Sequence, residues 1–258
     1  MEILQHIWGA TPEGEAIVIY TLKNSLGSEV QLSNIGAGIV SVKFADREGN
    51  IADVVLGYKD PMSYFGDGPC AGKTVGRVAN RIAGGQMTVE GKDYHLEVNN
   101  GPNHLHGGTK NFSNRLWESC VEYNRVIFTL VSEDGDCGYP AEVTTQVVYD
   151  FDDENNLEIT IYAKSDGTTP VNMTNHTYWN LSGENSGTIL DHNLQLNCSK
   201  ALEMNSVQIP MGSNFGNKLM TNVGSIRNKG IEFSLSGIPV QTNDWSVQLG
   251  FNGTFQDT

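Results

Sequence analysis

Short runs of alternating apolar and polar residues recur along most of the chain and predict β-strands. No apolar period of 3.6 residues continues for three turns, so long amphipathic helices are not expected. Turn-forming residues separate the runs at short, regular spacing. The expected strands are residues 16–22, 29–32, 38–44, 52–56, 86–89, 94–98, 116–123, 126–133, 141–151 and 156–163.

Two of these strand pairs read as hairpins. Residues 143–149 and 157–162 flank a polar turn at 152–155, and strict alternation in LEITIYA predicts one wet and one buried face. Residues 86–89 and 94–98 flank Glu90, Gly91 and Lys92, which indicates a tight turn. The pattern therefore predicts an all-β fold built from antiparallel strands.

Domain organisation follows from the lack of any break in this pattern. The sequence shows no low-complexity linker, no boundary in composition and no repeat of 20–50 residues. One domain over residues 1–258 is expected, a sandwich of large antiparallel sheets. From residue 213 onward the hydrophobic pattern weakens, which indicates either a long loop or a part of the fold whose partner strands are missing.

The charge balance narrows the range of partners. Sixteen Lys and Arg residues against 30 Asp and Glu residues give a formal net charge of −14. Such a surface repels phosphate backbones and anionic lipids, so neither nucleic acid nor membrane is an expected partner. A neutral ligand is compatible with this charge, whereas a sugar phosphate would need a local basic pocket.

Location and redox state are read from the apolar runs and the cysteines. The first 16 residues have neither the basic start nor the apolar run of a signal peptide. No apolar run in the sequence is long enough to span a bilayer, so a cytoplasmic location is expected. No two cysteines fall within CxxC spacing, which argues against a zinc or redox motif. Reduced, mostly buried thiols are expected at Cys70, Cys120, Cys137 and Cys198.

The segment GRVANRI, residues 76–82, carries two arginines four positions apart among small and apolar neighbours. An arginine held near the core needs partners, because an unpaired buried charge is costly. Arg77 and Arg81 therefore have two interpretations. Each is either a structural residue bonded to loop carbonyls or a forked donor aimed at hydroxyls or a carboxylate.

The segment NHLHGG, residues 103–108, carries two histidines that flank one leucine. In extended backbone His104 and His106 would point to the same face. A metal site would need more ligands, so one acid–base or hydrogen-bonding histidine is the favoured interpretation and no metal is expected. The two glycines would allow a ligand to approach the backbone closely.

The segment NHTYWNL, residues 175–181, places His176, Tyr178 and Asn180 on alternate positions. Aromatic rings beside hydrogen-bonding groups suit a sugar, whose apolar face stacks on rings while its hydroxyls pair with donors and acceptors. A core strand with satisfied polar groups explains the pattern equally well. Both interpretations stay open from the residues alone.

Taken together, the motifs resemble the galactose mutarotase (aldose 1-epimerase) family over about residues 20–212. The matching segments, besides the three above, are LSNIGAGIVSVKFADREGNIADVVLGY at 32–58, the region of Trp117, and GYPAEV at 138–143. The resemblance implies a galactose mutarotase-like β-sandwich, or supersandwich. It also implies interconversion of the α and β anomers of free aldohexoses such as galactose and glucose, with no cofactor.

The resemblance also implies roles for individual residues. His176 matches the general acid that protonates the ring oxygen, and His106 matches the second active-site histidine, which binds near the ring oxygen and the anomeric centre. Asp244, in TNDWSVQL, matches a substrate-binding aspartate, although Trp245 stands where the family has histidine. The residues matched to substrate contacts are Asn80, Arg81, His106, His176, Thr177, Tyr178 and Asp244.

The family's base is a glutamate in a strand that follows the aspartate motif, and this sequence ends at Thr258 before such a segment. Glu203 and Glu232 precede Asp244 and do not align with it. We therefore expect weak or absent mutarotase activity, missing C-terminal strands, and a monomer or dimer. The alternatives are a catalytically inactive sugar-binding module, a glucose-6-phosphate 1-epimerase-like enzyme, and a gene fragment or frameshifted product.

Overall fold

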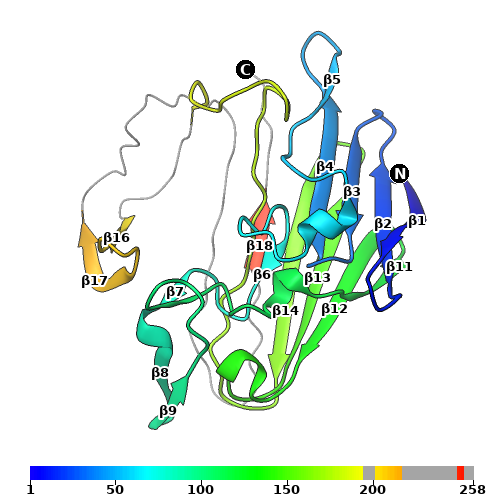
Figure 1. Cartoon of the computed structure of the whole chain (residues 1–258). Helices are drawn as coiled ribbons and strands as arrows, with labels where there is room; N and C mark the ends of the chain where they lie inside the picture. The colour runs from blue at the N-terminus through cyan, green and yellow to red at the C-terminus, as the bar shows by residue number, and fades with distance from the viewer. Residues whose placement is uncertain (194–200, 217–248, 253–258) are drawn as a thin grey trace.

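A computed structural model describes residues 1–193, 201–216 and 249–252 of the chain. Strands dominate these ranges, and the helical elements among them are four short 3-10 turns (Figure 1). No helix in the described ranges is long and apolar enough to cross a membrane. Most of the stretch after residue 213 lies outside the described residues, so neither interpretation of it is tested.

The first sheet contains five antiparallel strands in chain order. They are β1 (Glu2–Ala10), β2 (Ala16–Lys23), β3 (Glu29–Ser33), β4 (Gly38–Ala45) and β5 (Ile51–Asp53). The strand β1 is absent from the strands predicted from the sequence. This strand forms the edge of the sheet, and its Leu4 and Ile7 side chains are exposed, so it lacks the buried alternation that marks its neighbours.

The second sheet contains β11 (Glu118–Glu122), β12 (Arg125–Ser132), β13 (Val143–Phe151), β14 (Leu157–Ser165) and β18 (Leu249–Asn252), in that order. The predicted hairpin at 143–162 is confirmed, because β13 and β14 pair along their whole length from Val143 opposite Ser165 to Phe151 opposite Leu157. Alternate residues of these strands face the first sheet.

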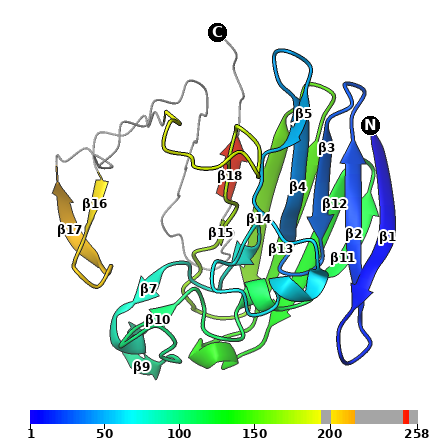
Figure 2. The same cartoon turned by 45° about the horizontal axis from the view of Figure 1, so that its top comes forward.

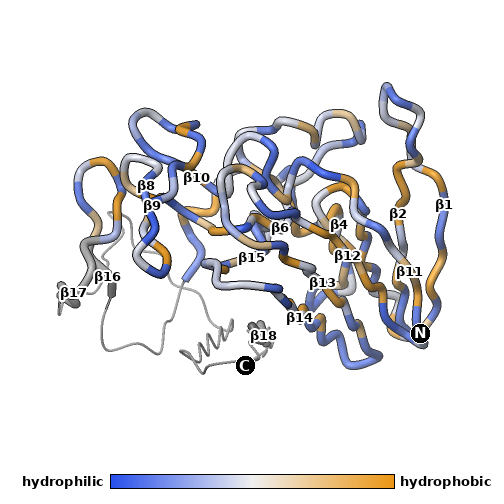
Figure 3. Tube along the Cα trace, turned by 90° about the horizontal axis from the view of Figure 1, so that it is seen from below, coloured by the Kyte–Doolittle hydropathy of each residue, from blue (hydrophilic) through white to orange (hydrophobic). Residues whose placement is uncertain are grey.

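The hydrophobic core lies between the two sheets. Leu22 and Leu32 of the first sheet belong to the same buried cluster as Val147 and Ile161 of the second. The ring centroids of Tyr20 and Phe128 lie 5.9 Å apart across the interface. In Figure 3 the hydrophobic stretches gather along β2, β4 and β12, and Figure 2 shows the two sheets stacked. The predicted antiparallel β-sandwich is confirmed.

Loops and two-stranded ladders connect and flank the sheets. The 3-10 turns are η1 (Pro61–Tyr64), η2 (Ala83–Gly85), η3 (Phe112–Asn114) and η4 (Asp136–Gly138). The ladders pair β6 (Thr74–Val75) with β15 (Thr174–Asn175), β7 (Arg81–Ile82) with β10 (His104–Leu105), β8 (Gln86–Val89) with β9 (Lys92–His95), and β16 (Ala201–Met204) with β17 (Pro210–Gly216).

Two predicted strands differ most from the structure in their bounds. The strand expected at 52–56 ends at Asp53, and Val55 then forms a single bridge with Trp179. The strand expected at 94–98 begins earlier, because Glu90 and Gly91 alone form the hairpin turn with φ angles of 51° and 76°. A two-residue turn with two positive φ angles matches the twist of a hairpin, so pairing resumes at once.

The cysteines in the described ranges are free thiols with differing exposure. Cys70 is buried, Cys137 is half-buried and Cys120 is exposed on β11. The expectation of mostly buried thiols is therefore wrong for Cys120, because β11 is an edge strand with one open face. Cys198 lies outside the described residues.

Candidate functional site

Three distant segments meet beside the sandwich, and they are the three motifs that the sequence analysis singled out. The strand β6 pairs with β15, which brings Thr74 opposite Asn175. The strand β7 pairs with β10, which brings Arg81 opposite Leu105. The next residue after β15, His176, donates its backbone N–H to the Lys73 carbonyl at 2.8 Å. Main-chain pairing thus places all three motifs at one site.

Asn80 and His106 hold each other in place through reciprocal hydrogen bonds. The Asn80 N–H donates to Nδ1 of His106 at 3.0 Å, and the His106 N–H donates to the Asn80 carbonyl at 2.9 Å. Both residues have left-handed backbone, with φ of 64° and 55°. Because Nδ1 accepts this hydrogen bond, it is unprotonated, and the neutral His106 ring carries its proton on Nε2. The ring therefore offers an Nε2–H donor to a ligand.

The rings of His106 and His176 lie edge to face, with centroids 5.3 Å apart and an interplanar angle of 85°. Both residues are half-buried. Burial lowers the pKa of His106 to about 4, and the positive charges of a protonated His176 and of Arg81 act in the same direction. His106 is therefore neutral at pH 7 and acts there as a hydrogen-bond donor.

Arg81 is half-buried at the same site, and part of its guanidinium has no hydrogen-bond partner among the described residues. Its Nε donates to Asn100 Oδ1 at 2.9 Å, and its Nη1 donates to Asn80 Oδ1 at 3.3 Å. No hydrogen bond within the described part of the chain uses Nη2. Since a guanidinium carries five N–H donors, Arg81 can still bond to hydroxyl groups of a ligand.

Tyr178 lies on the other side of His176, with ring centroids 5.2 Å apart. Its side chain is 40% exposed, and its hydroxyl donates to the Pro69 carbonyl at 3.2 Å. Thr177 differs, because its hydroxyl donates to Asn175 Oδ1, which also accepts the Thr177 N–H at 3.1 Å. Tyr178 thus presents an aromatic surface beside His176, while the Thr177 hydroxyl is engaged locally.

Asn180 is a buried structural residue and does not lie on the exposed face with His176 and Tyr178. Only 1% of it is exposed, and its Nδ2 donates to Ser186 Oγ and the Gly187 carbonyl. The alternation expected across NHTYWNL therefore holds for His176 and Tyr178 and fails at Asn180. Beyond Asn175 the segment is not a regular strand, so strict alternation does not continue.

Arg77 is a structural residue, as one of the two interpretations of GRVANRI predicts. It is 1% exposed. Its Nη1 donates to the Pro140 and Ala141 carbonyls at 2.7 and 2.9 Å. Its Nη2 donates to the carbonyl and the hydroxyl of Ser132 at 3.0 and 2.8 Å. Burial lowers the pKa of Arg77, and nearby Asp136 opposes that effect.

His104 is also structural, and the expectation that it shares a face with His106 is wrong. His104 is fully buried, with its ring nitrogens 2.6 Å from the Glu97 carbonyl and 2.7 Å from the Tyr139 hydroxyl. The left-handed φ of His106 ends the extended backbone on which the shared face depended.

The glycines that follow His106 make room for protein atoms. A Cβ at Gly107 would lie 1.9 Å from the Gly76 carbonyl oxygen. A Cβ at Gly108 would lie 2.8 Å from Glu97 Oε2. The close approach expected for a ligand at these glycines is instead made by the chain's own backbone and by a side chain.

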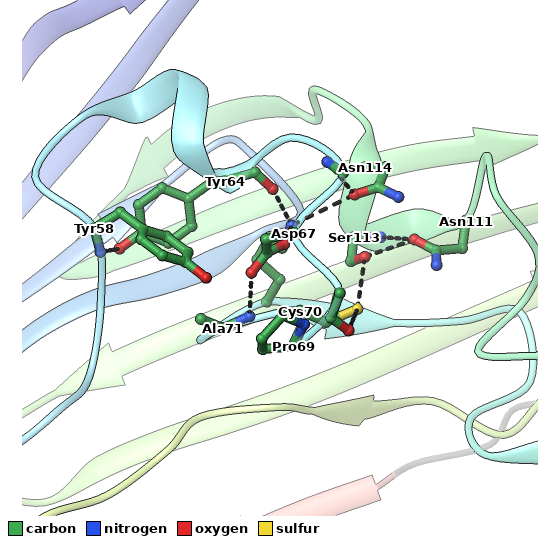
Figure 4. Close-up of polar contacts among 12 residues, drawn as sticks. Tyr58, Tyr64, Asp67, Pro69, Cys70, Ala71, Asn111, Ser113 and Asn114 are labelled. Carbon is green, nitrogen blue, oxygen red and sulfur yellow. Dashed lines mark hydrogen bonds and ion pairs between the residues drawn. The ribbon is translucent and has the colours of Figure 1, made fainter.

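A buried ion pair that the sequence analysis missed supports the loop next to Tyr178 (Figure 4). The Lys73 ammonium, fully buried, donates to Asp67 Oδ1 and to the Tyr64 carbonyl. Asp67 Oδ2 accepts the Ala71 N–H at 2.8 Å. These bonds hold the loop whose Pro69 carbonyl receives the Tyr178 hydroxyl. The signal in the sequence was only an Asp and a Lys six positions apart.

Ionisable groups that could add metal binding or a base are sparse here. Within the described ranges, no three His, Cys, Asp or Glu side chains are grouped so as to hold a metal ion. In the same ranges, no hydrogen bond or ion pair joins a carboxylate to the ring of His106 or His176. Asp244, expected to bind substrate, lies outside the described residues.

Related proteins align with this chain over most of its length. The galactose mutarotase of Bos taurus is 40% identical over 212 residues, which are 82% of this chain and 62% of the relative. The aldose 1-epimerase of Escherichia coli (strain K12) is 36% identical over 200 residues, or 77% of this chain and 58% of the relative. The chain thus spans about three-fifths of the length of these relatives.

Solved structures share the fold. An aldose epimerase homologue from C. elegans matches with a TM-score of 0.71 and 34% identity, covering 75% of this chain and 59% of that one. A galactose 1-epimerase from Lactobacillus acidophilus matches with a TM-score of 0.70 and 29% identity, covering 82% and 62%. The family model described as aldose 1-epimerase matches residues 18–222. The chain belongs to the aldose 1-epimerase family.

Proposed function

We propose that the site interconverts the α and β anomers of free aldohexoses such as galactose and glucose, with His176 as general acid. The observation that carries the proposal is the pair of His106 and His176 rings, 5.3 Å apart, beside the free donors of Arg81. Family membership supports the reaction class.

The chemistry requires two proton movements. A proton is delivered to the ring oxygen and another is removed from the anomeric hydroxyl, so that the C1–O5 bond breaks and an open aldehyde forms. Rotation about the C1–C2 bond and reclosure then give the other anomer, with both protons returned. Imidazole is suited to the first movement, because it gains and loses protons near neutral pH.

His176 is the better acid of the two histidines. No hydrogen bond within the described residues uses either of its ring nitrogens, whereas Nδ1 of His106 already accepts the Asn80 N–H. His106 is neutral at pH 7, with its pKa near 4, and so supplies an Nε2–H bond to the sugar oxygen without giving up the proton.

The remaining groups orient the sugar. Arg81 and Asn80 offer guanidinium and amide groups to the hydroxyls, and Tyr178 offers a half-open ring to an apolar sugar face. Bound in this way, the ring oxygen would lie between the two imidazoles. Positioning of this kind accounts for a large part of many enzymatic accelerations.

A second candidate function is sugar binding without turnover. The anomeric proton needs a base, and no carboxylate in the described ranges is bonded to His106 or His176. A site with an acid, donors for the sugar hydroxyls and an aromatic surface, but without a base, would bind aldohexoses and leave the anomer ratio unchanged.

One set of experiments separates the two functions. Anomer equilibration of α-galactose and α-glucose is followed by proton NMR against buffer alone, with His176→Asn as the variant. Because no base is bonded to either histidine in the described ranges, we expect the unsubstituted chain to exceed the spontaneous rate only weakly, and we expect His176→Asn to lose that excess. A rate equal to that of buffer contradicts the mutarotase proposal.

Binding of methyl β-galactoside, measured by calorimetry, then decides for or against the second function. The methyl group blocks ring opening, so binding is measured without turnover. Heat of binding that is lost in Arg81→Met, in a chain without catalysed equilibration, would support a sugar-binding module. Galactose 1-phosphate serves as the control for an anionic ligand.

A further inference from the structure

A hollow of about 270 Å³ lies on the first sheet. Its lining includes Gln31, Ser41 and Asp53 from β3, β4 and β5. Neither histidine of the candidate site contributes to it. The volume falls just below the range of about 300–1,000 Å³ for pockets that hold drug-sized molecules, so it suits a smaller ligand. We call this hollow the outer groove.

The strand register places the outer groove on the face opposite the core. Gln31 pairs with Ser41 across β3 and β4. Their neighbours Val30 and Val42 also pair with each other, and both belong to the buried cluster between the sheets. Because side chains alternate along a strand, Gln31 and Ser41 face outward. The groove is thus built on the rigid outer surface of the sandwich.

Ser41 is the unusual residue of the outer groove. It is only 4% exposed, and its hydroxyl has no hydrogen-bond partner within the described part of the chain. A buried hydroxyl without a partner costs about 1–3 kcal/mol. Since Ser41 lines the groove, a ligand with hydroxyl groups can supply the missing partner.

Aromatic rings form one side of the outer groove. Trp8 and Tyr58 both line it, and both pack edge to face on Tyr64, with centroids at 5.6 and 5.0 Å. Rings held in this way give a fixed apolar surface at low entropic cost. Such surfaces suit the C–H face of a sugar ring better than they suit a small inorganic ion.

Charges in the outer groove cancel. Asp53 and Glu184 are balanced by Lys43 and Lys59, and His6 is the remaining ionisable group of the lining. Lys43 also lies 3.4 Å from Glu29, outside the groove. A balanced lining gives an anion or a cation no net attraction, while its mixed donors and acceptors suit a neutral molecule with several hydroxyls.

We propose that the outer groove is a second binding site, separate from the His106–His176 site, for a neutral saccharide about the size of one sugar ring. The free hydroxyl of Ser41 and the amide of Gln31 bond the sugar hydroxyls, and the Trp8 and Tyr58 rings contact its apolar face. The proposal does not depend on the function proposed for the other site.

The test is an amide NMR titration of the full chain with methyl β-galactoside, which cannot open its ring. We expect shifts at Gln31, Ser41 and Asp53 that persist in His176→Asn. Ser41→Ala removes the hydroxyl without adding an atom, and we expect it to weaken binding in the outer groove by about tenfold. It should leave the melting temperature unchanged or raised, because an unpaired buried hydroxyl is lost.

Two further variants keep the test decisive. Gln31→Ala replaces a half-buried side chain and should also weaken binding in the outer groove, which keeps the test open if Ser41→Ala fails to fold. Thr160→Val is the matched control, since Thr160 is nearly buried on the second sheet and does not line the groove. Unmoved amides, unchanged affinity in both groove variants, or tighter binding of galactose 1-phosphate would each overturn the proposal.

Discussion

Arg77 and His104 differ from Arg81 and His106 in how many protein partners they have. The Arg77 guanidinium is surrounded by carbonyls and hydroxyls, and both ring nitrogens of His104 are occupied. Arg81 and His106 are half-buried, and each keeps a donor that no described protein group accepts. The same residue types in the same motifs are therefore held by several protein partners in one pair and keep a free terminal or ring donor in the other.

The number of protein partners thus distinguishes residues of the same type within one motif, which residue type alone does not. Both terminal nitrogens of Arg77 are bonded to protein oxygens, and only its buried Nε lacks a partner, whereas Nη2 of Arg81 is free to bond a ligand. Substitutions in this region and a change of pH test whether partner number determines the cost of losing a residue, from the largest expected effect to the smallest.

Arg77→Met should lower the free energy of unfolding by about 3–5 kcal/mol, because it leaves several buried carbonyls without donors. The matched variant Arg81→Met should cost less than about 1 kcal/mol, since Arg81 is half-buried and has fewer partners. Urea unfolding followed by tryptophan fluorescence measures both. Equal costs for the two variants would contradict the distinction.

Gly107→Ala should destabilise the protein by about 2–4 kcal/mol, because its Cβ would overlap the Gly76 carbonyl and its φ is 91°. The substitution should also break the reciprocal hydrogen bonds between Asn80 and His106. Gly101→Ala is the control, with a φ of 57° and open space around it, and should cost only about 1–2 kcal/mol. Thermal melting compares them. The interpretation fails if Gly101→Ala is the more harmful change.

Lowering the pH should lower the folding stability through protonation of His106. Its pKa is about 4 in the folded chain and about 6.5 when unfolded, so the unfolded chain binds more protons between these values. Stability is therefore full above pH 6.5 and falls, by up to about 3 kcal/mol, as pH drops toward 4. His106→Gln should flatten this slope in urea melts across pH 4–7. Identical slopes in both proteins would refute the assignment.

Asn80→Gly should change stability by only a few tenths of a kcal/mol, because asparagine and glycine both tolerate left-handed backbone. Asn80→Ala should cost about 1–2 kcal/mol at the same position. Both variants remove the side chain that accepts from Arg81, so both should lose affinity for methyl β-galactoside in calorimetry. Loss of affinity in Asn80→Ala alone would mean that the backbone, not the amide, matters.

Most of the fold was predictable from the sequence, since alternation along residues 143–163 specifies both strands and their turn. The edge strand β1 was not, because its exposed Leu4 and Ile7 follow no buried pattern. The bounds of β9 also depended on a two-residue turn that residue types alone do not specify. Local pattern therefore predicts strands that have a buried face, and it fails at edges and turns.

The site was predictable in part. The motifs named His176, His106, Asn80 and Arg81, and main-chain pairing brings these residues together. Which of two histidines faces the site depends on a left-handed φ at His106, which no spacing rule indicates. The Lys73–Asp67 pair gave no signal, because its meaning depends on burial. Asp244 remains an untested expectation.

The pairing of β6 with β15 also has a consequence for the order of events during synthesis. The Asn175 amide donates to the Gly72 carbonyl across 103 positions of sequence. The first sheet uses only residues up to Asp53 and can form early, as N-terminal segments emerge from the ribosome before later ones. A nascent chain that has not yet exposed Tyr178 therefore lacks the assembled candidate site around His106 and His176, and a ligand of that site cannot assist folding until then.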